Sequence, residues 1–421
     1  MHKATFFAFA LSATVLASCS LAAPLLSTSS WEVDGAASTA FAAAPLSIAW
    51  RFMTTFTNHP LFEQRMIQTC AECQPYWTTE LGKHFLFMRG INFIDLTGDY
   101  ERGPAYMTLM SEGALVPHKS LAGKLPKKVA HHDQLTGSIF KNISDAGPRA
   151  NLREFTAFRT RYYRSSTGRE SQAWLLKTVK NLAKQRSDLN ISVTEWPHSW
   201  GQNSIILHID GSDSEASQEE GITIVGAHQD STNLIPFLAA PGADDDGSGT
   251  VTILEALRAL LTNKKWKPIT DVEFHWYSAE EGGLLGSQEV VRGYADRNAV
   301  VKGMLQQDMT AFVKQGTEER VGLPTDFIDE ELREFVQLLI KEYLDIPAVD
   351  TKLGYAASDH ASWNKAGYRS VFAIEAPFDD CNLRRIHTTS DTFDHPEFSF
   401  DHLVKFVKLT SAFIVELSGW K

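Results

Sequence analysis

Residues 221–231 read Gly-Ile-Thr-Ile-Val-Gly-Ala-His-Gln-Asp-Ser and decide the fold. The first seven form a short apolar run rich in β-branched residues, which is typical of a strand buried on both faces. The run ends at His228, and polar residues that can carry chemistry begin there. This ending indicates a site on a largely parallel sheet, because open α/β sheets bind ligands at the carboxyl ends of their strands.

Similar segments recur from about Asn151 to the end of the chain. Strands alternate with helices there, which predicts an α/β protein with a mixed, mostly parallel central sheet and helices on both faces. Strands are expected at residues 191–196, 204–209, 272–279, 301–307 and 370–376, and helices at 170–186, 249–261 and 400–417, with a further short helix capped by Ser358.

Acidic residues and histidines follow several of these strands directly or lie in a glycine-rich loop before a helix. Each of them alone is more often a helix cap, an exposed pair or a hydrogen-bonded side chain. Chance does not explain why so many fall at strand ends, so together they predict one site. The candidates are His228, Asp230, Asp244, Asp245, Asp246, Glu280, Glu281, Asp308 and His387.

These residue types favour a pair of metal ions. Imidazole and carboxylate without thiolate are ligands that zinc accepts, whereas a structural zinc more often draws on cysteine. Two metals about 3.5–4 Å apart can share a water that is nucleophilic at neutral pH. Of the adjacent Glu280 and Glu281, one can bind metal while the other accepts a proton from that water. Asp230, two residues after His228, is placed to orient that histidine through its other ring nitrogen.

Charge and hydropathy exclude other classes of partner. The formal net charge is -11, which argues against a nucleic-acid partner because no basic patch is available to neutralise phosphates. After the N-terminus, no stretch reaches about 18 apolar residues without charges, so no membrane span is predicted. We expect a monomer.

Six strings occur in the order of a known motif set: GAHQDS (226–231), PGADDDGSGT (241–250), YSAEEGGLLGS (277–287), LQQDMT (305–310), GYAASDHASW (354–363) and RIHTTSDT (385–392). They resemble the co-catalytic two-zinc aminopeptidases, and above all the secreted fungal-type leucine aminopeptidases. The resemblance covers the chain from about Leu152 to the end. It extends more loosely to residues 90–95, which resemble the pro-segment of these enzymes.

The resemblance implies a role for each site residue. His228 and Asp308 hold one zinc, Glu281 and His387 hold the other, and Asp245 bridges both, so two Zn²⁺ are expected per chain. Glu280 is the general base, Asp230 orients His228, Tyr355 faces the substrate carbonyl or oxyanion, and Met309 is a wall of the substrate pocket. A cis peptide bond beside Asp245 is also expected. Some relatives join two cysteines around the turn at Tyr355, where this chain has Leu353 and Ala357.

The expected reaction is hydrolysis of the first peptide bond of a peptide with a free N-terminus, with a preference for leucine or other apolar residues. Three alternatives stay open. A carboxypeptidase on the same scaffold would bind a C-terminal carboxylate. A glutaminyl-cyclase-like enzyme would share the fold but use one zinc, and a binding module would have lost ligands.

The N-terminal part predicts secretion and processing. Residues 1–22 resemble a secretory signal, with a charged start, an apolar run from Phe6 to Leu16 and small residues near Ala22. Leu16 to Cys19 also resembles a bacterial lipoprotein box. Residues 23–120 are expected to be an inhibitory or chaperoning pro-segment, with an N-terminal subdomain as the alternative. Residues 121–421 are the expected zinc aminopeptidase catalytic domain.

Cysteines and sequons add two smaller expectations. Cys70 and Cys73 lack the further soft ligands that a zinc site needs, so a local disulfide or two free thiols is expected, and Cys381 is left unpaired. Asn142 and Asn190 lie in N-x-[ST] sequons that permit glycosylation.

Overall fold

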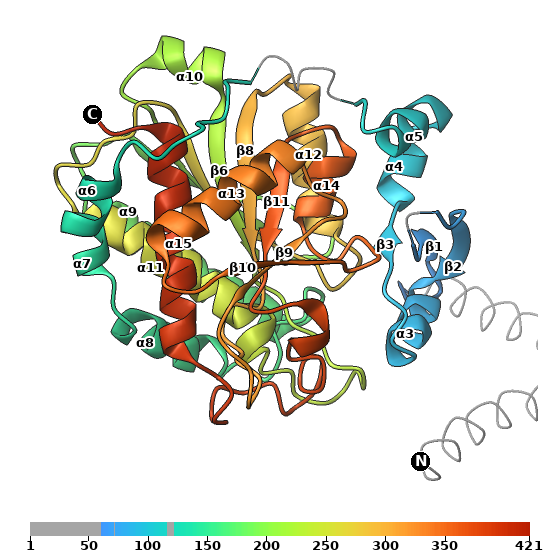
Figure 1. Cartoon of the computed structure of the whole chain (residues 1–421). Coiled ribbons are helices and arrows are strands. Elements are labelled where there is room, and N and C mark those ends of the chain that lie inside the picture. Colours follow the sequence, from blue (N-terminus) through green and yellow to red (C-terminus); the bar gives the residue numbers. More distant parts are fainter. Residues whose placement is uncertain (1–59, 71, 116–121) are drawn as a thin grey trace, which may run out of the picture. The chain divides into compact units, whose positions relative to one another are not determined.

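A computed structural model describes residues 60–70, 72–115 and 122–421 (Figure 1). The expected signal, residues 1–22, and residues 23–59 of the expected pro-segment lie outside the described residues.

The central sheet has six strands in the order β11-β8-β6-β7-β5-β4. The strands β11, β8, β6 and β7 run parallel, β5 is antiparallel to β7, and β4 is antiparallel to β5. The prediction of a mixed, mostly parallel sheet is therefore confirmed. The strands are β4 (Ile191–Trp196), β5 (Ser204–Ile209), β6 (Ile222–His228), β7 (Val272–Tyr277), β8 (Val301–Gln307) and β11 (Ser370–Ala373).

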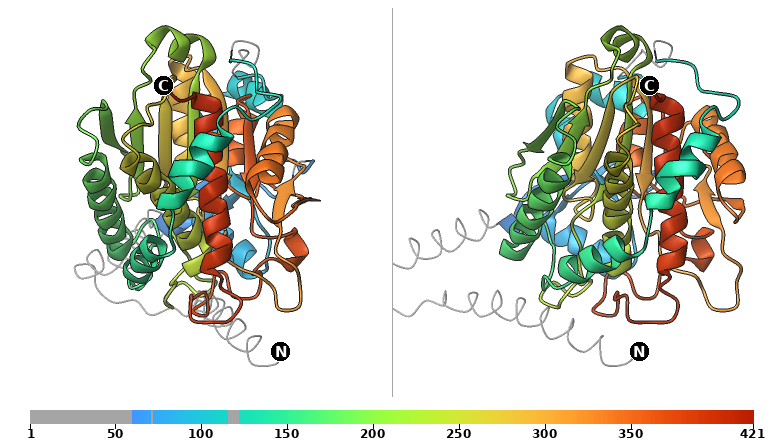
Figure 2. Two further views of the ribbon diagram at one scale, coloured as in Figure 1. Left: turned by 60° about the vertical axis from the view of Figure 1, so that its left-hand side comes forward. Right: turned by 90° about the vertical axis from the view of Figure 1, so that its left-hand side faces the viewer.

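Helices cover both faces of this sheet (Figure 2). Alternate side chains of a strand point to opposite faces, and both faces are apolar here. In β5, Ile205 and Leu207 belong to one buried cluster and Ile206 belongs to another. The first cluster includes α9 (Ser166–Ala183), α11 (Gly249–Thr262), α13 (Glu330–Tyr343) and α15 (Phe400–Ser418), and the second includes α12 (Leu285–Asp296) and α14 (His360–Lys365).

Sharp turns follow the carboxyl ends of the parallel strands. Ala279 after β7, Met309 after β8 and the loop residue His387 have positive φ angles of 58°, 54° and 58°. Such angles are uncommon for residues other than glycine, and they gather at functional sites, where the surrounding structure holds them. The turns therefore mark this edge of the sheet as the place to look for a site.

Residues 60–115 form a smaller unit around a second sheet. Its strands have the order β2-β1-β3, and all of them are antiparallel to their neighbours. Cys70 and Cys73 form a disulfide, which decides between the two expected states of this pair. Inside the unit, Lys83 Nζ lies 2.8 Å from Asp95 Oδ2. The elements are β1 (Gln64–Gln68), β2 (Tyr76–Thr79), α3 (Glu80–Met88), β3 (Ile94–Asp95), α4 (Thr97–Glu101) and α5 (Pro104–Ser111).

The remaining elements surround the main sheet. A parallel pair of strands, β9 and β10, lies beside it. None of the helices within residues 60–70, 72–115 and 122–421 is long and apolar enough to cross a membrane. These elements are α6 (His132–Gln134), α7 (Phe140–Asn142), α8 (Ala146–Phe155), α10 (Ser214–Glu220), β9 (Val321–Pro324) and β10 (Ala348–Thr351).

One local prediction is wrong. Ser358 does not cap the short helix α14, whose N-cap position is Asp359. The Ser358 hydroxyl donates instead to Asp308 Oδ2 over 2.6 Å, because the turn before α14 directs it to the end of β8.

Candidate metal centre

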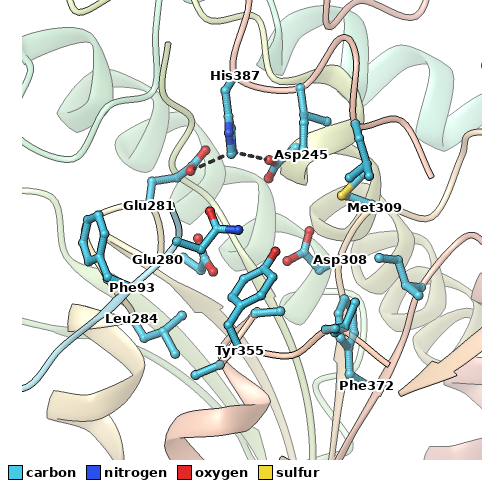
Figure 3. A pocket seen from close by; sticks show the side chains of 18 of the residues that line it. Phe93, Asp245, Glu280, Glu281, Leu284, Asp308, Met309, Tyr355, Phe372 and His387 are labelled. Atoms are coloured by element: carbon cyan, nitrogen blue, oxygen red, sulfur yellow. Dashed lines mark ion pairs between the residues drawn. The ribbon is translucent and has the colours of Figure 1, made fainter. Parts of the chain in front are cut away.

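The residues that were given a role come together at the carboxyl edge of the sheet, and all of them except His228 and Asp230 line one cavity (Figure 3). His228 ends β6, Glu280 and Glu281 follow β7, and Asp308 follows β8. Asp245 lies in the loop before α11, and its peptide bond to Asp246 is cis, as the resemblance implies. Their placement follows from the parallel strands, which end at the same edge.

The first ligand group contains His228, Asp245 and Asp308, all of which are buried. His228 Nε2 lies 3.0 Å from Asp245 Oδ1 and 3.6 Å from Asp308 Oδ2. His228 Nε2 has no hydrogen-bond partner, so the 3.0 Å contact with Asp245 is not a hydrogen bond. Three ligand atoms thus converge on one point without bonding to each other.

The second ligand group contains Asp245 again, with Glu281 and His387. His387 Nε2 lies 2.9 Å from Asp245 Oδ2 and 3.1 Å from Glu281 Oε2. Asp245 presents a different carboxylate oxygen to each group. The grouping of the five residues is therefore the one that a bridging Asp245 requires.

Unpaired polar atoms make these groups suitable for cations. Asp308 Oδ1, Glu281 Oε1 and both ring nitrogens of His228 are buried without a hydrogen-bond partner. Buried polar groups are normally paired, so such atoms call for a ligand. Burial, together with the charge of Asp245, raises the pKa of Glu281 to about 7 despite the nearby His387. The donor atoms are nitrogen and carboxylate oxygen, which fit zinc.

Asp230 and Glu280 lie next to the ligands. Asp230 Oδ1 lies 3.5 Å from His228 Nδ1 without forming a hydrogen bond to it. Its two oxygens also accept the backbone N–H groups of Glu280 and Glu281, over 3.1 and 3.2 Å. Asp230 therefore fixes the turn that carries both glutamates. Burial raises the pKa of Glu280 well above its usual range.

Apolar residues form the other wall of the cavity. Tyr355 points its hydroxyl into the space between Glu280 and Asp308, and Met309 lies near Asp245 and Asp308 (Figure 3). Leu353 and Ala357, at the positions of the missing cysteines, pack in an apolar cluster with Met309. The turn at Tyr355 is thus held by this packing together with Asp326, whose carboxylate accepts the backbone N–H groups of Leu353 and Gly354. Further apolar lining residues are Phe372, Ile374, Phe378, Leu383 and Ile386.

Residues from the unit 60–115 also line this cavity. Phe87, Asn92 and Phe93 lie on its wall, and the Phe87 ring centroid is 4.4 Å from that of His387. Asp95 N donates to Gly283 O, which continues the contact along the turn after Glu281. The cavity left between them measures about 80 Å³, well below the ~300–1,000 Å³ of pockets that enclose a ligand.

Several supporting residues were not among the sequence candidates or had no expected role. Asp246 accepts the backbone N–H of His228, Gly249 and Met309, which ties β6, α11 and β8 together. Asp244 accepts the side-chain amide of Asn382 over 2.9 Å. The triple aspartate was the only sequence signal for this arrangement, and it does not say which oxygen bonds which amide.

These features define a metal-dependent hydrolase site on an α/β sheet. A sequence model of Peptidase family M28 matches residues 204–413. Leucine aminopeptidase 1 of Metarhizium robertsii is 44% identical over 361 residues, which cover 84% of this chain and 86% of that protein. Leucine aminopeptidase 1 of Penicillium rubens is 44% identical over 83% of this chain and 90% of that protein. The chain therefore belongs to Peptidase family M28, with the leucine aminopeptidases of fungi.

Solved structures agree with this assignment. The LapA aminopeptidase of Legionella pneumophila has a TM-score of 0.71 and 25% identity, and the match covers 85% of this chain and 99% of that chain. A glutaminyl cyclase of Porphyromonas gingivalis has a TM-score of 0.50 at 16% identity over 65% of this chain, which shows the fold alone. The prediction of a zinc-dependent peptidase is confirmed, while the role of each residue stays a prediction.

Proposed function

We propose that this protein is a secreted aminopeptidase that uses two zinc ions to remove leucine and other apolar residues from the N-termini of peptides. His228, Asp308 and Asp245 would hold one ion, and Glu281, His387 and Asp245 the other. When bound, the ions supply Lewis-acid chemistry, which polarises the scissile carbonyl and lowers the pKa of water.

The protein's own residues supply the proton transfers. Glu280 accepts a proton from the attacking water and delivers it to the leaving amine, so that it returns to its starting state. The Tyr355 hydroxyl, which points into the cavity, donates to the carbonyl oxygen as negative charge develops there. The apolar wall around Met309 accepts the side chain of the first residue.

The charged residues that line the cavity are the observation that favours an aminopeptidase over a carboxypeptidase. Its lining includes four carboxylates, those of Asp245, Glu280, Glu281 and Asp308. Among the described residues that line it, none is lysine or arginine. A carboxypeptidase needs a cation beside its cavity for the C-terminal carboxylate of its substrate, and no lysine or arginine among the described lining residues supplies one, which favours an aminopeptidase.

Two matched variants test the proposed base. Glu280→Gln should lower kcat by about 10²–10⁴-fold, the usual contribution of a general base, and leave two zinc ions bound. Glu281→Gln should lose zinc as well as activity, because it removes a ligand. Zinc content is measured by elemental analysis, and activity with leucine p-nitroanilide. Near-normal kcat in Glu280→Gln would refute the base assignment.

Substrate and metal controls separate the alternatives. The aminopeptidase should cleave leucine p-nitroanilide and leave N-acetyl-leucine p-nitroanilide intact. A carboxypeptidase should instead cleave an N-blocked peptide with a free C-terminus. One zinc per chain, with no hydrolysis, would favour a glutaminyl-cyclase-like enzyme.

The unit 60–115 supports a zymogen. Phe87 lies against the ligand His387, and Asn92 and Phe93 occupy the cavity wall where a peptide would bind. We therefore expect residues 23–120 to be removed after secretion. The measurement is N-terminal sequencing of the secreted protein, with activity assayed before and after cleavage. A mature chain that starts near Ala23 and is fully active would contradict this expectation.

A further inference from the structure

Arg161 is buried beside the candidate metal centre and has no role in the reaction described above. Its exposed fraction is 0%. All three guanidinium nitrogens donate to main-chain carbonyls: Nε to Gln229 O over 2.9 Å, Nη2 to Gly242 O over 2.8 Å, and Nη1 to Pro241 O. Burying a positive charge costs free energy. A buried arginine whose nitrogens donate only to backbone carbonyls therefore calls for a functional explanation.

The three carbonyls belong to two of the three segments that carry the first ligand group. Gln229 directly follows the ligand His228, and Gly242 lies three residues before Asp245. A second link runs parallel to the first, because Arg161 N donates to Ser231 Oγ, which itself donates to Ala240 O. Arg161 therefore ties the end of β6 to the loop that carries the shared ligand.

The loop is shaped for this side chain. Gly242 has a φ of 53°, a region that favours glycine. A Cβ atom at Gly242 would lie 2.6 Å from Asp245 O and from Ser231 Cβ and 2.8 Å from Arg161 Nη2, so the loop packs this closely against the guanidinium and its own ligand residue only with glycine here. The guanidinium also lies 4.2 Å from the centroid of the Phe155 ring, which fixes its plane.

A buried carboxylate holds the same loop from the other ligand group. Asp391 accepts the backbone N–H groups of Asp244 and Asp245, both over 3.1 Å. Asp391 lies four residues after the ligand His387. The loop is thus held on one side by a cation that reaches the His228 segment and on the other by an anion from the His387 segment.

We infer that Arg161 is a positioning residue that sets Asp245 relative to His228 and so determines how tightly the first ligand group binds zinc. The planar guanidinium suits this task, since its fixed fork reaches several carbonyls at once, which the single ammonium of lysine does not. Its charge also offsets part of the negative charge of the carboxylates in the site. This inference rests on the proposed two-zinc site.

The test compares two buried arginines. Arg186 also donates to backbone carbonyls, those of Asn263 and Trp266, each over 2.9 Å. Asn263 follows the far end of α11, whose 14 residues span about 20 Å at the usual helical rise. Arg186→Met therefore removes a comparable buried network that is distant from the site.

Zinc affinity of the metal-free protein is measured by competition with a zinc-binding dye, and folding by circular dichroism and thermal unfolding. Arg161→Met should bind zinc at the first group about 10–100-fold more weakly, the usual effect of losing a residue that orients ligands. Arg161→Lys should fall between this variant and the wild type. Arg186→Met should lose stability and keep its zinc affinity.

Wild-type protein that binds no zinc at these residues would refute the proposed function itself. Wild-type zinc binding with unchanged affinity in both Arg161 variants would overturn only the role of Arg161. Equal losses of affinity in Arg161→Met and Arg186→Met would also overturn it, because the effect would then be general. If neither Arg161 variant folds, Arg161 serves folding and the proposal fails.

Discussion

Two groups of histidines and carboxylates lie on the same sheet, and they differ in whether their polar atoms have partners. In the inner group, His275 Nε2 lies 2.8 Å from Glu273 Oε2 and His275 Nδ1 lies 2.9 Å from the Tyr277 hydroxyl. Glu273 also bonds His208 Nδ1 over 2.8 Å and accepts the Tyr294 hydroxyl. Every polar atom of this carboxylate has a partner within the protein.

The group at the carboxyl edge has the same residue types and the opposite arrangement. His228 Nε2, Asp308 Oδ1 and Glu281 Oε1 have no hydrogen-bond partner, and the carboxylates of Asp308 and Glu281 border a cavity. Hydrogen bonds to His208, His275 and Tyr294 outweigh burial and lower the pKa of Glu273, whereas burial raises that of Glu281. A histidine close to a carboxylate therefore does not by itself indicate a metal site. The edge group differs from the inner group in its ligand atoms that lack a hydrogen-bond partner.

A third arrangement supports the same lesson. His198 Nε2 lies 2.8 Å from Ser204 Oγ, and its Nδ1 lies 2.5 Å from Glu289 Oε2, which is the geometry of a nucleophilic serine with its base. Ser204 is fully buried and accepts the backbone N–H of Ser278. A serine that substrate does not reach is structural, whatever its neighbours.

The largest expected effect comes from removing the ligand that both edge groups share. Asp245→Asn should lower kcat/KM by about 10³-fold or more, since Lewis-acid stabilisation is worth several kcal/mol and each ~1.4 kcal/mol is tenfold. The metal-free variant should stay folded, because the substitution removes one of several crowded charges. Zinc content and kcat/KM with leucine p-nitroanilide are the measurements. A variant that keeps two zinc ions would contradict a bridging Asp245.

The matching substitution in the inner group should act on stability instead. Glu273→Gln leaves the buried His275 and the partly exposed His208 without their carboxylate partner, and losing the partner of a buried polar group typically costs about 1–3 kcal/mol. The free energy of unfolding is measured by urea denaturation, and kcat at a temperature where the variant is folded. We expect kcat close to that of the wild type. A large fall in kcat without a loss of stability would show that the two groups do not differ as described.

The sequence predicts much of the sheet and of its edge. The strands β4, β5 and β8 have the predicted bounds. Polar turn residues on both sides of each short apolar run mark where the strand begins and ends. The site follows from strand ends and ordered motifs. α13 is absent from the expected helices although Leu332, Phe335, Val336 and Leu339 follow helical spacing.

Other features depend on contacts that sequence does not encode locally. A buried apolar strand carries no mark of its direction, so the antiparallel placement of β5 beside β7 was not predictable. The contact of Phe87 with His387 joins residues 300 positions apart. Equally, nothing in the residue types separates His275, which is fully paired, from His228, which is not. The structure is needed to tell them apart.

The smallest expected effect concerns His208, the partly exposed histidine of the inner group, and the pH dependence of the stability that it adds. Burial lowers the pKa of His208, but the hydrogen bond to Glu273 and the charges of Asp271 and Asp210 outweigh it and raise the pKa above its ordinary value. A histidine with a raised pKa in the folded state adds stability that is complete below its unfolded pKa of about 6.5. That stability is lost as the pH rises through the folded pKa.

Wild-type protein should therefore exceed His208→Gln in free energy of unfolding at pH 6, and the excess should shrink by pH 8.5. The change should be about 1 kcal/mol or less, because His208 is partly exposed and its pairs are screened. Urea denaturation of both proteins at the two pH values measures it. The same pH change should leave the ratio of their kcat values constant, since the inner group does not reach the cavity. A ratio that follows the stability difference would show that the paired group and the edge group are coupled, and would remove the distinction drawn between them.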